Sequence, residues 1–389
     1  MPIASDNDVV ICGAVRTPLQ RAYKGKFKEL HPEDLLAAAL KGLVRKTGIN
    51  PNAIQDIAVG TVLTPGGGAT AARMAAFSAG FPETCSIMTV NRQCSSGLQA
   101  IAAIASSITS GQIDIGIGAG MESMSRNYGD FSSLSFSTDV MNSCDQASDC
   151  LMPMGETAEI VAESFGVDRQ AQDRFSLCSH QKAARAQQQG LFAEEIIPID
   201  NVTDDDGIRL QATIESLSAL KPAFRPPPLG TATAGNSSQI TDGAAAVLLA
   251  RRSTARALGL VILARFCSYA VVGVPPRVMG VGPAYAIPVA VKRASLTLQD
   301  IGIFEINEAF ASQILYCIRE LKIDPERVNP KGGAIAFGHP LGATGARQMA
   351  TLLPEMRRQG ARYGVISMCI GTGMGAAAVI ALEPATSRL

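Results

Sequence analysis

The stretch VNRQCSSG, residues 90–97, lies between two apolar segments of different character. Residues 87–90 are apolar and partly β-branched, which predicts a strand, whereas residues 98–105 are apolar on nearly every side, which predicts a buried helix. Cys94 therefore stands where a strand turns into a helix. The free N–H groups and the dipole of a helix start favour a thiolate, so we expect Cys94 to ionise more easily than a free cysteine. The competing interpretation is a thiol that only packs in the core.

The composition is that of a large, well-buried globular protein. Of 389 residues, 47% are hydrophobic and 17% are charged, which excludes a disordered chain. Lys and Arg total 34, as do Asp and Glu, and no long basic run occurs. This balance argues against a nucleic-acid partner. No apolar stretch reaches the roughly 18 residues of a transmembrane helix, so we expect no membrane span.

The cysteine and histidine content indicates reduced thiols and no metal site. Nine cysteines occur without a CxxC pair, and no signal peptide is recognisable, which is typical of a reducing compartment. Only three histidines occur, so a zinc cluster is not expected. We predict neither a metal nor a bound cofactor.

The last three residues are Ser387, Arg388 and Leu389. They are similar to the peroxisomal address Ser-Lys-Leu, with arginine keeping the positive charge of the lysine. We therefore expect a peroxisomal protein that binds an import receptor through these residues.

Strands alternate with helices in two separate runs of the sequence, which predicts an α/β fold. The predicted strands lie at residues 8–14, 57–62, 87–90, 113–120, 244–250, 262–269, 303–306, 363–367 and 375–381. The predicted helices lie at residues 32–47, 72–79, 98–110, 157–165, 169–189, 283–294, 308–321 and 343–359. Residues 122–239 break the alternation and are too long for a structureless loop, so we expect an insertion that covers a site.

The two α/β runs look like copies of one plan. Residues 55–57 read Gln-Asp-Ile before a strand, and residues 299–301 repeat these letters before another, 244 positions later. The same offset carries Cys94 onto Gly338, beside His339. Two packed copies would bring these equivalent corners together.

This duplication predicts three units. The N-terminal half comprises residues 1–121 and 240–264, the inserted loop domain residues 122–239, and the C-terminal half residues 265–389.

Further candidate residues lie at the ends of other predicted strands, where ligands of α/β proteins bind. His339 lies between glycine and proline, so it belongs to a rigid loop and not to a helix interior. Asn307 follows one strand, and Cys369 opens a glycine-rich turn after another. The glycines at 371–375 are spaced GxGxG and do not follow the first strand, which argues against a dinucleotide-binding fingerprint.

This set of side chains suits covalent acyl transfer. Cys94 would take the acyl group after His339 activates the thiol, and Cys369 would move a proton on and off carbon. Backbone N–H groups and Asn307, through a water, would hold the oxyanions. Taken singly, Cys369 fits a packed core thiol equally well, and Asn307 fits a turn or cap better than catalysis.

Four blocks of sequence resemble the signature motifs of the thiolase family and occur in the family's order. They are residues 91–97, 307–311, 338–342 and 369–373. The resemblance covers essentially the whole chain. It implies duplicated βαβαβαββ halves in a five-layer αβαβα arrangement with an inserted loop domain, and a homodimer.

The resemblance also implies a ping-pong reaction. Cys94 would be acylated by a 3-ketoacyl-CoA as acetyl-CoA leaves, and a second CoA would take the shortened acyl chain. One oxyanion hole would use His339 and a water bound to Asn307. The other would use the backbone N–H groups of Cys94 and Gly371.

Other positions match the family's substrate contacts and its subtypes. Ser238 matches a CoA-contacting serine, and Arg209 is a weaker match for a phosphate contact. Met154 follows a proline where short-chain biosynthetic members carry His-Met-Gly, and Thr372 replaces the middle glycine of the usual CxGGG. Both departures resemble the peroxisomal degradative members, which act in fatty acid β-oxidation. The alternatives are a biosynthetic acetoacetyl-CoA thiolase and a non-catalytic acyl-CoA binder.

Overall fold

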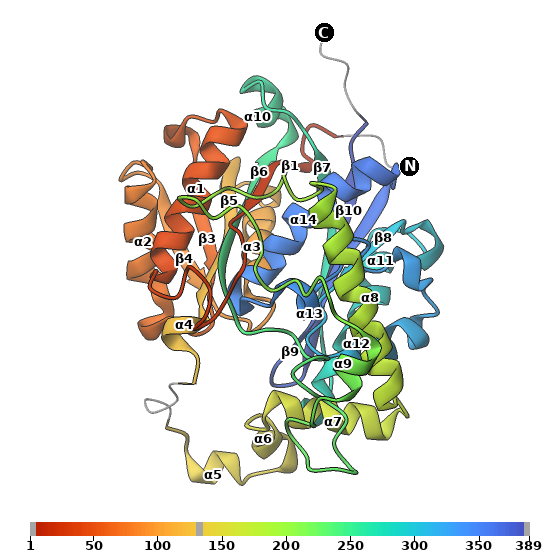
Figure 1. Ribbon diagram of the computed structural model, residues 1–389. Helices are drawn as coiled ribbons and strands as arrows, with labels where there is room; N and C mark the ends of the chain where they lie inside the picture. The colour runs from red at the N-terminus through yellow and green to blue at the C-terminus, as the bar shows by residue number, and fades with distance from the viewer. Residues whose placement is uncertain (1–4, 130–134, 385–389) are drawn as a thin grey trace.

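The computed structural model describes residues 5–129 and 135–384 (Figure 1). Its strands, in chain order, are β1 (Val9–Arg16), β2 (Gln20–Arg21), β3 (Asp56–Gly60), β4 (Ser86–Val90), β5 (Ile115–Ser123), β6 (Thr241–Arg251), β7 (Ala264–Gly273), β8 (Ile303–Ile306), β9 (Tyr363–Ile370) and β10 (Met374–Leu382). They follow the order β4-β3-β5-β6-β1-β7-β10-β9-β8, with β2 paired to β6. The C-terminal tripeptide expected as a peroxisomal address lies outside the described residues.

The sheet divides into two half-sheets with the same plan. In the first, β3 is parallel to β4 and β5, and β6 is antiparallel to β5 and β1. In the second, β8 is parallel to β9, and β10 is antiparallel to β9 and β7. The counterpart of β4 is reduced to a parallel bridge between Phe304 and Val328. The half-sheets join where β1 pairs with β7 through Val10–Arg265 and Ile11–Ala264.

The main helices form three layers, one between the half-sheets and one on the outer face of each. Further helices lie in the segment between β5 and β6. They are α1 (Pro32–Thr47), α2 (Ala69–Ser78), α3 (Ser96–Thr109), α4 (Met124–Asn127), α5 (Thr138–Met141), α6 (Asp145–Asp149), α7 (Met154–Ser164), α8 (Arg169–Gln188), α9 (Ile214–Ser218), α10 (Arg252–Ala257), α11 (Gly282–Arg293), α12 (Ala311–Leu321), α13 (Ala334–Phe337) and α14 (Thr344–Gln359).

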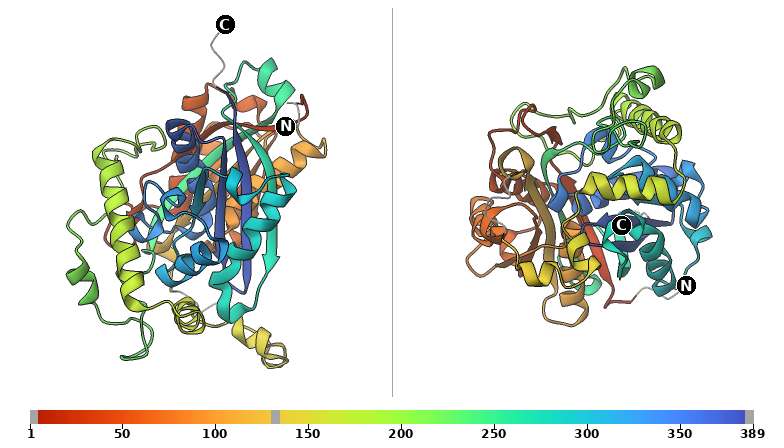
Figure 2. Two further views of the ribbon diagram at one scale, coloured as in Figure 1. Left: turned by 90° about the vertical axis from the view of Figure 1, so that its right-hand side faces the viewer. Right: turned by 90° about the horizontal axis from the view of Figure 1, so that it is seen from below.

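The core is built as five layers, as predicted. Helices α1 and α2 pack on the outer face of the first half-sheet, α3 and α14 lie between the half-sheets, and α11 and α12 cover the second. Figure 2, seen from below, shows outer helices on both sides with strands between them. Strand β6 explains the layering, because its side chains alternate between two cores. Ala246 and Leu248 face α1, whereas Val247 and Leu249 face α3 and α14.

The segment between β5 and β6 packs against the second half. Helix α8 lies beside α12 and α13, and α7 also contacts α12 (Figure 1). The sequence predicted α7 and α8 to within a few residues, but its helix at 308–321 begins too early. Helix α12 starts at Ala311, because Phe310 is held in a bridge with Ser237 and the N–H of Ala311 donates to Asn236. The division into units at residues 121, 239 and 264 stays a proposal.

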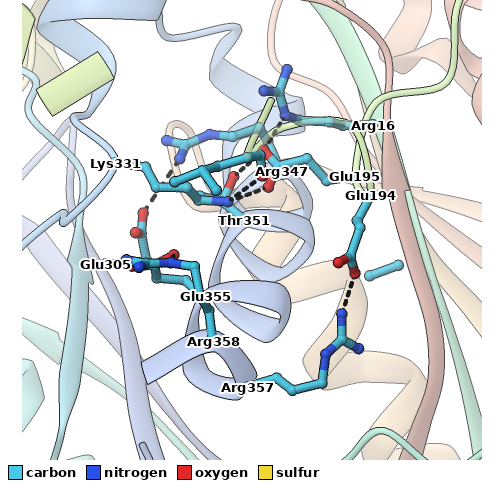
Figure 3. Close-up of polar contacts among 12 residues, drawn as sticks. Arg16, Glu194, Glu195, Glu305, Lys331, Arg347, Thr351, Glu355, Arg357 and Arg358 are labelled. Atoms are coloured by element: carbon cyan, nitrogen blue, oxygen red, sulfur yellow. Dashed lines mark hydrogen bonds and ion pairs between the residues drawn. The ribbon is translucent and has the colours of Figure 1, made fainter. Parts of the chain in front are cut away.

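Buried ion pairs join the insertion to both halves (Figure 3). Arg16, at the end of β1, binds Glu195 with 2.7 Å between Nε and Oε1, and Asp205 with 2.8 Å between Nη1 and Oδ1. Lys331 of the second half binds Glu195 with 2.6 Å between Nζ and Oε2. These side chains are almost completely buried. Since a buried charge is costly unless it is paired, this cluster fixes the insertion against both halves.

Replacing Arg16 with methionine is expected to lower the free energy of unfolding by about 3–5 kcal/mol, because Asp205 would stay buried without its cation and Glu195 would keep only Lys331. The matched control is Arg256→Met, which breaks an ion pair with Asp6 whose side chains are 60% and 69% exposed. That change should cost at most about 1 kcal/mol. Urea unfolding measures both values, and equal losses would contradict the role given to the buried cluster.

No helix among the described residues is long and apolar enough to cross a membrane.

Candidate active site

Cys94 lies in a strained turn between β4 and α3. Gln93, just before it, has φ of +48°, a left-handed conformation that few residues other than glycine adopt. Ser96 holds this turn, because its hydroxyl donates to the carbonyl of Gln93 at 2.6 Å and accepts from the N–H of Arg92 at 2.9 Å. Strain of this kind persists only where its surroundings enforce it, which is common at functional sites.

The surroundings of the Cys94 thiol make it less acidic, contrary to the prediction from the helix start. Burial raises its pKa to about 11, against the lowering effect of N–H groups from Gly371 and from Cys94 itself, while the charge of Glu122 raises it further. The prediction of a more acidic thiol is therefore wrong for the free protein. The lost solvation of a thiolate outweighs two N–H donors, so the thiol needs a base.

Cys369 lies near the end of β9 and is fully buried. Its apolar neighbours include Met154, Ala158, Met279, Ala309 and Phe310. Burial is the largest cause that holds the pKa of Cys369 well above its usual value, and the next is the charge of Cys94. The two predicted thiols are therefore close enough to affect each other's ionisation.

His339 and Asn307 meet inside the protein, as the pattern of strand ends predicts. The distance between His339 Nε2 and Asn307 Nδ2 is 3.3 Å, and His339 Nδ1 lies 2.6 Å from Thr344 Oγ1. Burial, followed by the charge of Arg347, lowers the pKa of His339 to about 3, so the ring is neutral near pH 7. Because a hydroxyl can donate or accept, Thr344 can support either tautomer of the ring.

The start of β6 holds the loop that carries His339. The N–H of His339 donates to the carbonyl of Gln239 and to Thr241 Oγ1, at 3.1 and 3.2 Å. Gly338 has φ of +110°, and a Cβ there would lie 2.1 Å from Thr241 Oγ1. Only glycine fits this position, so a strand of the first half fixes the histidine of the second half.

The turn between β9 and β10 completes the site. The backbone N–H of Gly371 lies close enough to the Cys94 thiol to lower its pKa, against the larger effect of burial. A Cβ on Gly371 would lie 3.5 Å from Met154 Sδ, so Met154 also borders this space. Thr372, the departure from the expected glycine, has φ of +69°.

The two predicted CoA contacts differ in their placement. The N–H of Ser238 donates to the carbonyl of Ala309 at 2.9 Å, which puts Ser238 beside the corner that carries Asn307. The N–H of Arg209 donates to His180 Nδ1 at 3.2 Å. Among the described residues, no contact places Arg209 next to Cys94.

Several residues that shape the site were missed in the sequence. Thr344, Gln239 and Thr241 hold His339, and Glu122 lies close enough to Cys94 to affect it. The sequence did carry signals for two of them. Thr344 is a hydroxyl residue at the start of a predicted helix, and Glu122 is a carboxylate at the end of an apolar predicted strand. Within residues 5–129 and 135–384, no group of His, Cys, Asp and Glu could hold a metal ion.

The geometry defines the class of protein. Cys369 lies near the end of β9, Asn307 follows β8 and contacts the neutral His339, and Cys94 is close enough to Cys369 to affect its ionisation, all within a duplicated five-layer fold. Residues 9–253 match the family described as Thiolase, N-terminal domain, and residues 260–382 match Thiolase, C-terminal domain. The chain belongs to the thiolase family.

Relatives at high identity narrow this class. The chain is 56% identical over 393 residues to 3-ketoacyl-CoA thiolase A, peroxisomal, of Rattus norvegicus, covering 97% of this chain and 89% of the relative. The dimeric peroxisomal thiolase of Saccharomyces cerevisiae superposes with a TM-score of 0.93 at 47% identity, covering 98% and 99% of the chains. A second structure of peroxisomal 3-ketoacyl-CoA thiolase from that yeast, described as five-layered with two core domains of identical topology, has a TM-score of 0.83 at 42% identity, covering 98% and 100%. The predicted fold class is confirmed.

The rate at which iodoacetamide alkylates Cys94 is expected to keep rising with pH beyond about 8.5, the pKa of a free cysteine. Only the thiolate reacts, and burial raises the pKa of this thiol to about 11. Short pulses of reagent across the pH range, with the Cys94 peptide quantified by mass spectrometry, measure this. The peptide of the exposed Cys144 serves as an internal reference. A plateau below the free-cysteine value would contradict the expectation.

Proposed function

We propose that this protein catalyses the thiolytic cleavage of 3-ketoacyl-CoA by CoA, giving acetyl-CoA and a chain-shortened acyl-CoA in peroxisomal β-oxidation. The observation that carries the proposal is the contact between His339 and Asn307, together with a Cys94 thiol close enough to Cys369 to affect its ionisation. Acyl transfer needs one thiol to hold the acyl group, and C–C cleavage needs a second acid to protonate the leaving carbon. The names of the peroxisomal relatives support the same reaction.

In the first half-reaction, Cys94 Sγ attacks the C3 carbonyl of the substrate while its proton passes to Nε2 of His339. The N–H groups of Cys94 and Gly371, which act to lower the pKa of the Cys94 thiol, would hold the oxyanion on the attacked carbon. The bond between C2 and C3 then breaks. The electron pair moves onto the departing acetyl-CoA as an enolate, and Cys94 keeps the acyl group.

The enolate needs a donor for its oxygen and a proton for its carbon. Protonated Nε2 of His339 can donate to the oxygen, together with a water held by Asn307. Oδ1 of Asn307 is buried and has no partner among the described residues, which leaves it free to bind that water. Cys369 gives its proton to C2, and acetyl-CoA leaves. In the second half-reaction, the Cys369 thiolate takes the proton of the incoming CoA, whose sulfur attacks the acyl group on Cys94. The bond between Cys94 Sγ and the acyl carbon breaks, the chain-shortened acyl-CoA leaves, and the Cys94 thiolate takes its proton back from His339.

The substrate contacts form the next part of the proposal. The apolar neighbours of Cys369, among them Met154 and Phe310, suit an acyl chain, and Phe224 packs edge-on against Phe310 with 6.0 Å between ring centroids. Ser238 would contact CoA beside this cluster, and Arg209 would contact a phosphate. CoA acts here as a substrate and not as a resident cofactor.

Location and assembly extend the proposal. We propose a peroxisomal homodimer, supported by the names of its relatives, one of which is described as dimeric. Import would depend on a receptor that binds Ser387, Arg388 and Leu389; the support for this step is the sequence of the tripeptide.

Cys94→Ala and Cys369→Ala should fail at different steps. Cys94→Ala is expected to form no acyl-enzyme, because the nucleophile is gone. Cys369→Ala should still be acylated by a simple thioester such as acetyl-CoA but lose C–C cleavage, by about 100-fold or more, because the enolate carbon has no acid. Intact-protein mass spectrometry measures the acyl-enzyme, and thiolysis of a 3-ketoacyl-CoA measures cleavage. Equal loss of both steps in both variants would count against this division of roles.

A series of 3-ketoacyl-CoA substrates separates the candidate functions. The degradative enzyme should keep a high kcat/KM for chains beyond four carbons, because the apolar cluster around Cys369 gains buried surface with each methylene, about 0.8 kcal/mol when fully enclosed. A steep fall beyond four carbons would favour the acetoacetyl-CoA thiolase instead. Binding of CoA without turnover of any substrate would favour the non-catalytic binder.

A further inference from the structure

Glu122, at the end of β5, is a fully buried carboxylate that no step of the reaction uses. Its Oε2 accepts hydrogen bonds from the N–H groups of Val62 at 3.0 Å and Gly342 at 2.9 Å. Its Oε1 accepts from the N–H of Leu63 at 3.1 Å and from Thr61 Oγ1 at 3.3 Å. Three of these donors follow β3 in the first half, whereas Gly342 belongs to the loop of the second half that carries His339.

Gly342 is also held from its other side. A Cβ on Gly60 or on Gly97 would lie 2.7 Å from the carbonyl oxygen of Gly342, and a Cβ on Gly120 would lie 2.3 Å from it. These glycines come from β3, from the start of α3 and from β5, so the loop crosses the Cys94 corner at backbone contact. Since Gly97 is three residues from Cys94 and Gly342 three from His339, this crossing sets the distance between nucleophile and base.

The charge of the Glu122 carboxylate also acts on the nucleophile, Cys94. This charge opposes ionisation of the Cys94 thiol, while the site already holds that thiol neutral by burial. Burial raises the pKa of Glu122 itself to about 7, although its N–H and hydroxyl donors act to lower it. Its four donors nevertheless make the ionised form a good acceptor at this junction.

We propose that Glu122 is a positioning residue for the thiolase reaction, which ties the His339 loop to the Cys94 corner and so sets the distance across which the proton passes. It touches neither substrate nor reacting atoms. Its carboxylate acts through the backbone of Gly342, and its negative charge opposes premature ionisation of the nucleophile.

Two substitutions separate reach from charge. Glu122→Asp keeps the charge but is one methylene shorter. Its carboxylate therefore cannot accept hydrogen bonds from Gly342 and from the segment after β3 at the same time. Glu122→Gln keeps the length but replaces the negative charge by an amide. Glu159→Gln is the matched control, because Glu159 is also buried and accepts from a threonine hydroxyl and two backbone N–H groups, of Thr231 and Ala232, all within the insertion.

In Glu122→Asp, kcat for thiolysis should fall about 10-fold to 100-fold while KM for CoA changes by less than about twofold, since proton transfer is misaligned and CoA contacts are not. The pH profile of Cys94 alkylation should stay near that of the wild type. In Glu122→Gln that profile should move to lower pH, because the opposing charge is gone. Glu159→Gln should leave the pH profile of Cys94 alkylation unchanged. Its kcat should fall by no more than the loss of folded protein explains.

Several results would overturn the proposal. One is a folded Glu122→Asp with wild-type kcat. Another is a Glu122→Gln whose alkylation profile and kcat follow those of Glu159→Gln. If neither variant at position 122 folds, as judged by circular dichroism, the carboxylate is a folding residue and the proposal fails.

Discussion

The close approach of α3 and α14 between the two half-sheets is the constraint on which the rest of the structure depends. A Cβ on Gly97 would lie 3.0 Å from the N atom of Ala346, and one on Gly345 would lie 2.2 Å from the N atom of Leu98. The starts of both helices therefore cross at backbone contact, which side chains larger than hydrogen would prevent. Because Cys94 precedes one helix and His339 the other, this crossing brings the nucleophile and the base of two copied halves into one site.

The same packing buries Cys369, His339 and Asn307 and leaves Cys94 only partly exposed, and this loss of solvation decides the protonation states. Burial holds the thiols of Cys94 and Cys369 neutral and keeps the ring of His339 unprotonated. A site whose thiols and histidine are all neutral cannot rely on a preformed thiolate, so each bond change must be accompanied by a proton transfer between neighbours. Correct distances then matter more than pKa values, which explains why the loop of His339 is held by Gln239, Thr241 and Thr344.

Much of the fold could be predicted because each strand and helix carries its own periodicity. The alternation in β6 and the apolar surface of α3 both follow from burial on two sides, and the repeated Gln-Asp-Ile pointed to a duplicated plan. The start of α12 was missed, because contacts with residues 236 and 237 hold Phe310 and Ala311 at that point. The acidity of Cys94 was also predicted wrongly, since a helix start is visible in the sequence but the depth of burial is not.

The sequence by itself determined the order of the elements, the resemblance to one family and the identity of the four candidate side chains, because these depend on residue type and spacing along the chain. Only the tertiary structure decided how those side chains meet. It placed Asn307 Nδ2 3.3 Å from His339 Nε2, set the Cys369 thiol in an apolar cluster and gave Glu122 donors from both halves. The physical reason is that desolvation and hydrogen-bond geometry arise between segments far apart in the chain, and no local pattern encodes them.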